Sequence, residues 1–223
     1  MTDGAGLSTS PLDAAHRRLS ATMAEFGGWE MPIAYPTGTI EEHLACRRGA
    51  AMFDVSHLGT VRVDGPDALD RLQRAFTNDL TRIEPGRAQY THLLDPDDAS
   101  VLDDVIVWWH PHGDSTGDVF DVMPNASNTD RVSAAVGGTD ITAERAVIAV
   151  QGPSARDVVR RVFPAAGDVG RFRVATAAWS DAECTVAGTG YTGEPGVEIA
   201  VPVAAATELW EALADAGAVP AGL

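Results

Sequence analysis

Apolar residues recur along the chain at two spacings, and these spacings predict a mixture of strands and helices. Short runs rich in valine, isoleucine and aromatic residues are typical of strands. They occur at 59–64, 88–94, 101–109, 118–123, 146–152, 172–177, 184–188 and in the segment VEIAVPV that follows Gly196. The run AVIAVQG at 146–152 is apolar almost throughout, which indicates a strand buried on both faces.

Helical spacing appears in six other segments. Leu69, Leu72 and Phe76 follow Pro66 three and four positions apart, and proline favours the first turn of a helix. Further helices are predicted at 11–26, 39–50, 128–136, 153–162 and 204–217. Thr39 followed by Glu42 fits a capping box at the start of the second of these. No strand is expected after the last helix. Because strands and helices do not alternate strictly, the pattern favours an α+β fold with mostly antiparallel sheets.

The amino-acid composition limits the kinds of molecule that the chain is expected to bind. The chain has 223 residues, 32 acidic against 16 basic side chains, and a net charge of −16; every basic side chain is arginine. Such a charge argues against binding to nucleic acid or to an anionic membrane surface. Acidic residues spread along a chain without lysine suggest an organism that lives in high salt, with a GC-rich genome as the alternative. Two distant cysteines and no long apolar stretch predict a cytoplasmic protein.

The run VLDDVIVWWH contains two aspartates, Asp103 and Asp104, inside an otherwise apolar strand. Successive side chains of a strand face opposite sides, so one carboxylate must face a packed side or a cleft. An acid in a partly dry cleft is a candidate acid or base. The alternative is that the pair only begins the strand at a turn, because Asp-Pro-Asp-Asp precedes it.

Two glycine-containing segments and one Ser-His pair are further candidates. The segment GTGYTGEPGVE, from Gly188 to Glu198, allows tight turns or a close approach to a ligand, but it matches neither a dinucleotide nor a phosphate-loop signature. A simple hairpin turn is the alternative. Ser56 and His57 are neighbours and so make a poor nucleophile–base pair. The turn at Gly152 is read as the end of a strand rather than an anion site.

No set of histidines and cysteines completes a metal site, so no metal is expected. His43 with Cys46, and His110 with His112, are pairs that lack further ligands.

Taken together and in order, the motifs resemble those of the T-protein family of the glycine cleavage system, the tetrahydrofolate-dependent aminomethyltransferases. The matching stretches span about residues 9–223, and the most specific are FDVSH, LDD, QGP and GYTGE. The resemblance implies that Asp104 is the residue essential for the chemistry. It also implies that tetrahydrofolate, the co-substrate, contacts five further residues, namely Tyr90, Trp108, Asn125, Tyr191 and Glu198.

The resemblance further implies a fold and a reaction. The fold would be two intertwined α+β domains with mostly antiparallel sheets flanked by helices, together forming a folate-binding region over 1–223 with a middle subdomain at 56–140. The reaction would transfer a methylene group from the aminomethyl-lipoyl arm of H protein, the partner, to tetrahydrofolate, with release of ammonia. In the family a β-domain follows the closing PAGL, so the chain is expected to be part of a longer protein.

Three alternatives stay open at this point. One is a related folate-dependent demethylase, although those are often fused to flavin domains. Another is a non-catalytic folate-binding protein, although such proteins tend to lose the aspartate pair that is kept here. The third is an inactive fragment.

Overall fold

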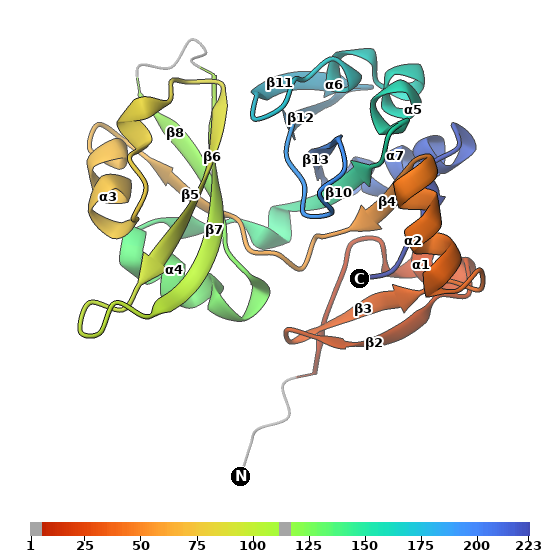
Figure 1. Cartoon of the computed structure of the whole chain (residues 1–223), viewed down its shortest axis with the longest axis horizontal. Coiled ribbons are helices and arrows are strands. Elements are labelled where there is room, and N and C mark those ends of the chain that lie inside the picture. The colour runs from red at the N-terminus through yellow and green to blue at the C-terminus, as the bar shows by residue number, and fades with distance from the viewer. Residues whose placement is uncertain (1–5, 112–116) are drawn as a thin grey trace.

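The computed structural model describes residues 6–111 and 117–223, which form three β-sheets arranged around a common centre (Figure 1). A six-stranded and a five-stranded sheet face each other, and a small three-stranded sheet lies beside the larger one. Strand pairing is antiparallel except between β1 and β3 and between β4 and β14. The α+β class with mostly antiparallel sheets, predicted from the sequence, is confirmed.

The six-stranded sheet is built from both ends of the chain. Its strands in spatial order are β11 (Val174–Trp179), β12 (Ala182–Ala187), β13 (Gly196–Pro202), β10 (Arg145–Gln151), β4 (Ala51–Asp54) and β14 (Val219–Pro220). The expectation that no strand follows the last helix is therefore wrong, because β14 pairs with β4. Two residues are too few to give a periodic signal, and their pairing depends on tertiary contact alone.

Both faces of the central strand β10 are buried, as its apolar run predicts. Ala146, Ile148 and Val150 face a core formed with three helices: α5 (Ala155–Val162), α6 (Pro164–Gly167) and α7 (Val203–Asp215). Val147 and Ala149 face the opposite way, into a core shared with the five-stranded sheet. The six-stranded sheet therefore forms a layer between its own helices on one face and the five-stranded sheet on the other.

The five-stranded sheet carries the aspartate pair. In spatial order its strands are β6 (Arg87–Leu94), β7 (Val101–Trp109), β8 (Val119–Met123), β5 (Val61–Asp64) and β9 (Thr139–Asp140). Helices α3 (Ala68–Ala75) and α4 (Thr129–Val136) cover one face with a core of their own, into which Val105 and Val107 point. All of these elements lie within the 56–140 segment expected as a middle subdomain.

The N-terminal region differs from its prediction. A helix was expected at 11–26, but α1 covers only Asp13–Arg18 and the chain then turns into β2 (Thr22–Phe26) and β3 (Trp29–Ala34), which pair with each other and with β1 (Ser8–Thr9). Ser20 has a positive φ that ends the helix. Gly27 and Gly28 both have positive φ and connect Phe26 to Trp29 in a two-residue hairpin loop, which is a Gly-Gly hairpin signal.

Helix α2 (Thr39–Arg48) is where it was predicted, but its capping box is not formed. Gly38 is the N-cap residue, and no side chain caps the helix. Glu42 is buried and turned away from the helix end, where its carboxylate accepts hydrogen bonds from the backbone N–H of Tyr35 (2.6 Å) and of Gly222 (2.9 Å). Glu42 therefore joins the N-terminal hairpin to the last residues of the chain.

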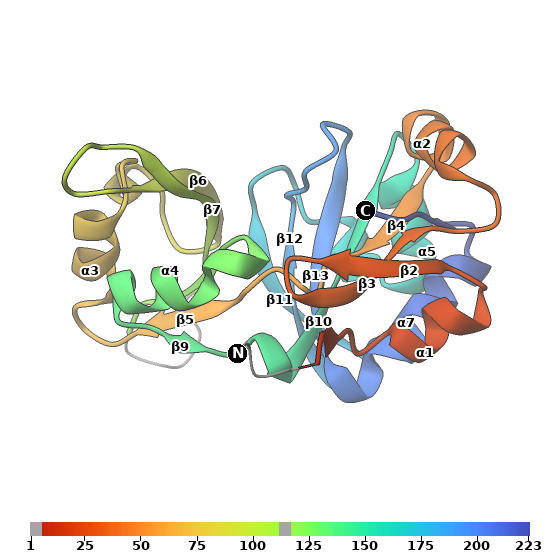
Figure 2. The same ribbon diagram turned by 90° about the horizontal axis from the view of Figure 1, so that it is seen from below.

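The five-stranded sheet is inserted between two neighbouring strands of the larger one. The chain leaves β4, forms the middle unit and returns as β10, which pairs with β4 (Figure 2). Arg145, at the start of β10, binds the segment that leaves β4. Its guanidinium donates to the carbonyls of Ser56 (3.2 Å) and Leu58 (2.7 Å) and to the hydroxyl of Thr60. The two large sheets are thereby held in a fixed relation.

No helix in the described part of the chain is long and apolar enough to cross a membrane.

Candidate functional site

A cavity of about 500 Å³ lies where the two large sheets and the β2–β3 hairpin meet. Its walls are largely apolar, with six side chains that carry polar or charged groups. Those six are His57, Tyr90, Asp104, Asn125, Tyr191 and Glu198. Five of the six residues that the sequence resemblance implied are therefore brought together around one space, although they come from distant parts of the chain.

The two aspartates of β7 face opposite sides, as strand alternation requires. Asp103 is buried on the face of Val105 and Val107, whereas Asp104 is exposed and lines the cavity. Both lie inside the strand, which begins at Val101, so they do not merely form the turn before it. The second aspartate is the one available to a ligand.

Asp103 accepts three hydrogen bonds from the chain. Its carboxylate accepts from the backbone N–H of Asn125 (3.1 Å), from the Asn125 side-chain amide (2.8 Å) and from the Asn128 amide (3.0 Å). A buried carboxylate is tolerated when its lone pairs are satisfied in this way. Asp103 thus anchors the segment after β8 and sets the position of Asn125.

Asp104 keeps its carboxylate open to the cavity but is held from two sides. The Tyr90 hydroxyl donates to Oδ2 at 3.2 Å, and the Asn125 amide donates to Oδ1 at 3.2 Å. Partial desolvation and the neighbouring carboxylate raise the pKa of Tyr90, so its hydroxyl keeps the proton it donates. These two partners fix the orientation of the carboxylate and leave lone pairs for a ligand.

The opposite wall of the cavity comes from the glycine-rich segment. This segment joins β12 to β13, so the hairpin interpretation is confirmed, and it also lines the cavity through Gly190, Tyr191 and Glu198. A Cβ on Gly190 would lie only 2.0 Å from the Gln151 amide oxygen. The glycine is required there because β10 approaches so closely.

Glu198 is a buried carboxyl group at the cavity wall. Burial raises its pKa, and a hydrogen bond from the Thr189 hydroxyl opposes that rise only in part. No arginine or histidine forms an ion pair with it among the described residues. A carboxyl group in this setting holds a proton more readily than an ordinary glutamate and can both donate and accept a hydrogen bond.

Trp108 is the implied residue that the structure does not bring to the cavity. It shares the Asp104 face of β7 but is 0% exposed, in the core between the two large sheets beside Ala88 and Val147. Its ring therefore belongs to the core that packs the two large sheets together. Tyr191, by contrast, is half exposed and lies edge-on to Phe53, with ring centroids 5.5 Å apart.

His57 is a cavity residue that the sequence motifs did not predict. It is a poor partner for Ser56, yet it lines the cavity at 4% exposure and lies edge-on to Phe26. Its Nδ1 atom is enclosed without a hydrogen-bond partner among the described residues. Burial lowers the pKa of His57 to about 4, so the ring is neutral near pH 7. A lone histidine in an apolar surrounding was the only signal available.

The pairs considered as metal ligands form no cluster of three or more suitable side chains within residues 6–111 and 117–223. His110 is bonded to Asp121, with Nε2 2.8 Å from a carboxylate oxygen. His112 lies outside the described residues.

Comparison with known proteins gives a consistent result. A family model described as the GCVT N-terminal domain matches residues 12–223. A probable aminomethyltransferase of Halobacterium salinarum is 42% identical over 224 residues, covering 94% of this chain and 60% of that protein. An aminomethyltransferase of Chlorobaculum tepidum is 43% identical over 218 residues, covering 92% of this chain and 58% of that protein.

A solved structure is similar along nearly the whole chain. The crystal structure of glycine cleavage system aminomethyltransferase T from Bartonella henselae matches with a TM-score of 0.84 and 30% identity, covering 97% of this chain and 60% of that one. The chain thus spans about 60% of the length of these relatives. The expectation of a high-salt organism stays a prediction.

Proposed function

The chain belongs to the GCVT N-terminal domain family, and from that premise we propose that it carries the folate-binding and reacting part of an aminomethyltransferase of the glycine cleavage system. The reaction would replace the C–S and C–N bonds of an aminomethyl thioether with two C–N bonds to tetrahydrofolate. The two folate N–H protons would pass to the sulfur and to the amine, giving a free thiol and ammonia. The observation that carries the proposal is the Asp104 carboxylate, oriented by two donors at the edge of a largely apolar cavity.

The cavity suits a bicyclic ring with polar groups on its edges. Apolar side chains of the five-stranded sheet, of strand β2 and of the segment after β4 line it, and its polar groups are few and placed at separate points, which is the usual design of a small-molecule site. Its volume of about 500 Å³ can take a bicyclic ring with part of its substituent. Asp104 and Glu198, on opposite walls, would then contact different edges of that ring.

Asp104 would act on the reacting nitrogen and carbon. Its open lone pairs can accept a hydrogen bond from a folate amine and so orient the nitrogen lone pair toward the methylene carbon. The same negative charge would stabilise an iminium-like cation as the amine leaves. Because Tyr90 and Asn125 already hold the carboxylate, little reorganisation is needed when the charge develops.

Glu198 would recognise the ring rather than take part in bond changes. Its raised pKa favours the protonated form, which offers one donor and one acceptor side by side. An amino-pyrimidinone edge offers the complementary pair. His57 is neutral, and its Nδ1 atom has no hydrogen-bond partner in the described ranges, so it would supply a further polar contact at the cavity wall.

The partner would be the lipoyl-bearing H protein, whose arm must bring the aminomethyl group to Asp104. Support for this partner comes from the family membership and from the similarity to the Bartonella protein, an aminomethyltransferase of the glycine cleavage system. Tyr90 and Asp104 are both exposed, so an arm entering from outside can reach the carboxylate.

The substitution Asp104→Asn tests the proposal. We expect turnover of an aminomethyl-loaded H protein by the 223-residue chain to fall at least about 100-fold, because the oriented charge is lost while the shape is kept. Tetrahydrofolate affinity, measured by calorimetry, should change less than about threefold. Asp70→Asn, an exposed aspartate on α3, makes the same change of charge away from the cavity and should leave both quantities unchanged.

Two results would contradict the proposal. If the folded wild-type chain binds no tetrahydrofolate, the cavity is not a folate site. Equal losses of affinity and turnover in Asp104→Asn would reduce the aspartate to a binding residue without a role in bond changes.

A further inference from the structure

One histidine at the cavity wall has polar atoms that the packing of the chain leaves unused. His57 follows β4, is almost fully buried and lines the cavity together with Asp104. Its Nδ1 atom is enclosed without a hydrogen-bond partner, and Nε2 forms no hydrogen bond within the described ranges. Leaving a buried polar group unpaired costs free energy, which a ligand in the cavity can recover.

The backbone on both sides of His57 is held in place by buried groups. The Asp54 carboxylate accepts a hydrogen bond from the Ser56 N–H at 2.9 Å. Arg145 donates to the carbonyls of Ser56 (3.2 Å) and Leu58 (2.7 Å), the two neighbours of His57 in the chain. Asp54 and Arg145 are themselves buried. The ring is therefore presented to the cavity by a fixed segment, and a fixed position is the first requirement for proton transfer.

Asp54 and Arg145 also act on the charge of the ring. Burial is the main cause of the lowered pKa of His57; Asp54 opposes the lowering, and the positive charge of Arg145 adds to it. Arg145 is satisfied by carbonyl and hydroxyl oxygens and forms no ion pair in the described part of the chain. The ring is therefore neutral when a ligand arrives, and an imidazolium formed there gives up its proton readily.

The proposed reaction needs a group that moves protons inside the cavity. Each of the two protons starts on a folate nitrogen and ends on a leaving group. A nitrogen that has just formed a fourth bond holds its proton weakly, whereas the amine needs a proton before it can leave as ammonia. A side chain that accepts the first proton and supplies the second favours both steps.

The other polar side chains of the cavity suit this transfer poorly. Asp104 is needed as a negative charge, and a carboxylate that took the proton would be neutral when the cation beside it forms. Burial raises the pKa of Tyr191 and of Glu198, and desolvation raises that of Tyr90, so these three groups keep their own protons. The Asn125 amide does not titrate.

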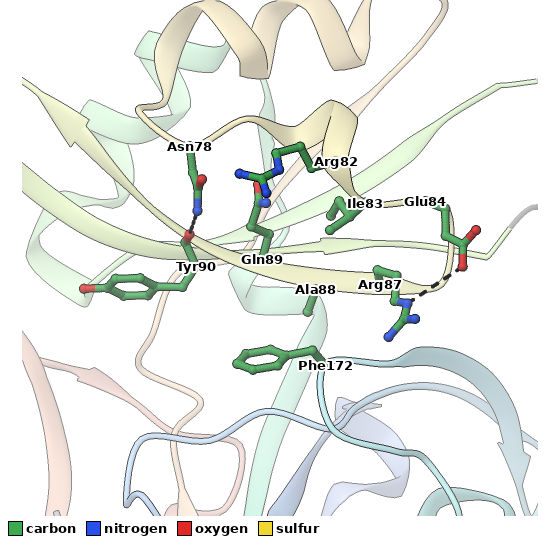
Figure 3. Close-up of a pocket in the computed structure, with 9 residues that line it drawn as sticks. All are labelled: Asn78, Arg82, Ile83, Glu84, Arg87, Ala88, Gln89, Tyr90 and Phe172. Atoms are coloured by element: carbon green, nitrogen blue, oxygen red, sulfur yellow. Dashed lines mark hydrogen bonds and ion pairs between the residues drawn. The ribbon is translucent and has the colours of Figure 1, made fainter.

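Arginine side chains are absent from the cavity lining among the described residues. Arg82 and Arg87 line a neighbouring hollow along β6, and Figure 3 shows the Tyr90 side chain extending away from both of them. An arginine stays protonated near neutral pH and cannot accept a proton. His57 is therefore the cavity residue that offers a neutral nitrogen with a free lone pair.

We propose that His57 carries a proton from the attacking folate nitrogen to the departing amine, while Asp104 stabilises the cation. This inference rests on the proposed function, because it assigns one of the two proton transfers of that reaction to a residue.

The steps balance as follows. The first folate nitrogen bonds to the methylene carbon, and the C–S bond breaks with its electron pair on sulfur. The proton of that nitrogen passes to the imidazole and then to the amine, whose C–N bond breaks with its electron pair leaving on ammonia. The folate nitrogen forms the iminium, the second folate nitrogen bonds to the carbon, and its proton passes to the thiolate. His57 ends as it began.

The substitution His57→Gln keeps a polar side chain at the cavity wall but cannot carry a proton. At pH 7.5 we expect turnover of aminomethyl-loaded H protein by the whole chain to fall at least about 100-fold, the usual scale of proton-transfer catalysis. Tetrahydrofolate affinity, measured by calorimetry, should change less than about threefold, because the loss concerns the transition state. His43→Gln, at an exposed histidine of α2, is the matched control and should leave both quantities unchanged.

Chemical rescue separates proton transfer from a structural role. His57→Ala leaves a gap of the size of an imidazole ring, and added imidazole should raise the turnover of this variant at least about tenfold. Pyrrole has the same ring shape but no nitrogen lone pair free to take a proton, so it should have no effect. Imidazole should not raise the turnover of the wild type or of Asp104→Asn, in which His57 is still present.

Three results would overturn the inference and leave the proposed function intact. They are turnover of His57→Gln within about threefold of the wild type, equal losses of affinity and turnover in that variant, and failure of imidazole to exceed pyrrole in the rescue of His57→Ala. A folded wild type that binds no tetrahydrofolate, or that binds it without turnover, would overturn the proposed function and the inference with it.

Discussion

Two polar clusters lie on either side of β4, and they differ in how far their hydrogen bonds are satisfied. Under the six-stranded sheet, Asp54 accepts from Ser10, from His16 (Nε2 to Oδ2, 2.8 Å) and from the Ser56 backbone (2.9 Å), while the other His16 nitrogen meets the Tyr35 hydroxyl at 2.8 Å. In the cavity, by contrast, Asp104 keeps open lone pairs, and within the described part of the chain no charged side chain pairs with His57 or Glu198.

The difference indicates that one cluster stabilises the fold, whereas the other is available to bind a ligand. A buried network whose members satisfy one another rigidifies the fold and has nothing left for a ligand. A cavity whose polar groups are short of partners costs stability in the free protein and recovers it when a complementary molecule arrives. Substitutions in the two clusters should therefore have different consequences.

The largest effect on stability is expected for Asp54→Asn. The substitution removes the charge of a completely buried pair with His16, and such a loss typically costs roughly 3 kcal/mol. The measurement is urea unfolding at pH 7.5. The exposed pair of Asp13 with Arg17 supplies the control, and Asp13→Asn should cost less than about 1 kcal/mol. Equal costs would remove the distinction between the clusters.

The Asp54 effect should also depend on pH. Burial alone would raise the pKa of Asp54, but its hydrogen bonds with His16, Ser10 and Ser56 outweigh burial and hold it below the usual value. A carboxylate with a lowered pKa stabilises the fold above the unfolded-state pKa, and this contribution disappears as pH falls through the folded-state pKa. The gap between wild type and Asp54→Asn should therefore narrow in strong acid.

His57→Gln is expected to have a smaller effect on the free energy of unfolding, and this effect should depend on pH. The unfolded chain binds a proton at His57 near pH 6.5, whereas the folded chain does so only near pH 4. Wild-type stability should fall between these values as the pH is lowered, and the variant should lose less over the same range. Unfolding free energies at pH 7.5, 6 and 5 measure this. His43→Gln, at an exposed histidine, should follow the wild type; a parallel decline in all three proteins would show that the cavity imidazole is not the cause.

The smallest change in stability is expected for Glu198→Gln. An amide resembles the protonated carboxyl that burial favours, so the cost at pH 5 should stay within about 1 kcal/mol. Because a raised carboxyl pKa makes the wild type lose stability as pH rises through it, the variant should gain relative to wild type between pH 5 and 8. Thermal midpoints at the two pH values, with exposed Glu183→Gln as control, test the sign; a relative loss at pH 8 would contradict it.

Elements with a long periodic pattern were predictable from the sequence, and short ones were not. Strand β7 and helices α4 and α5 lie within a few residues of their predicted bounds because burial on one face repeats along them. Strand β4 was missed because its four residues are all buried and show no alternation. The β2–β3 hairpin was not predicted because the apolar spacing of 11–26 also fits a helix, although Gly27–Gly28 is itself a hairpin signal.

The candidate site followed from motif resemblance much more than from periodicity. Alternation predicted that Asp103 and Asp104 face opposite sides, but it could not show which side holds a cavity. It also placed Trp108 on the face of Asp104, although the depth of a side chain depends on the sheet packed against it. His57 lines the cavity only because Phe26 and the five-stranded sheet enclose it, and those residues lie far from it in the sequence.

The insertion of one sheet between two paired strands of another affects the order of folding. Strand β4 cannot pair with β10 until about 90 intervening residues bring their ends together, and closing so long a loop carries an entropic cost. A middle unit that has already folded presents both ends side by side, so that Arg145 can join them. Folding of the middle unit would then precede closure of the larger sheet, and the cavity would be the last part of the molecule to take shape.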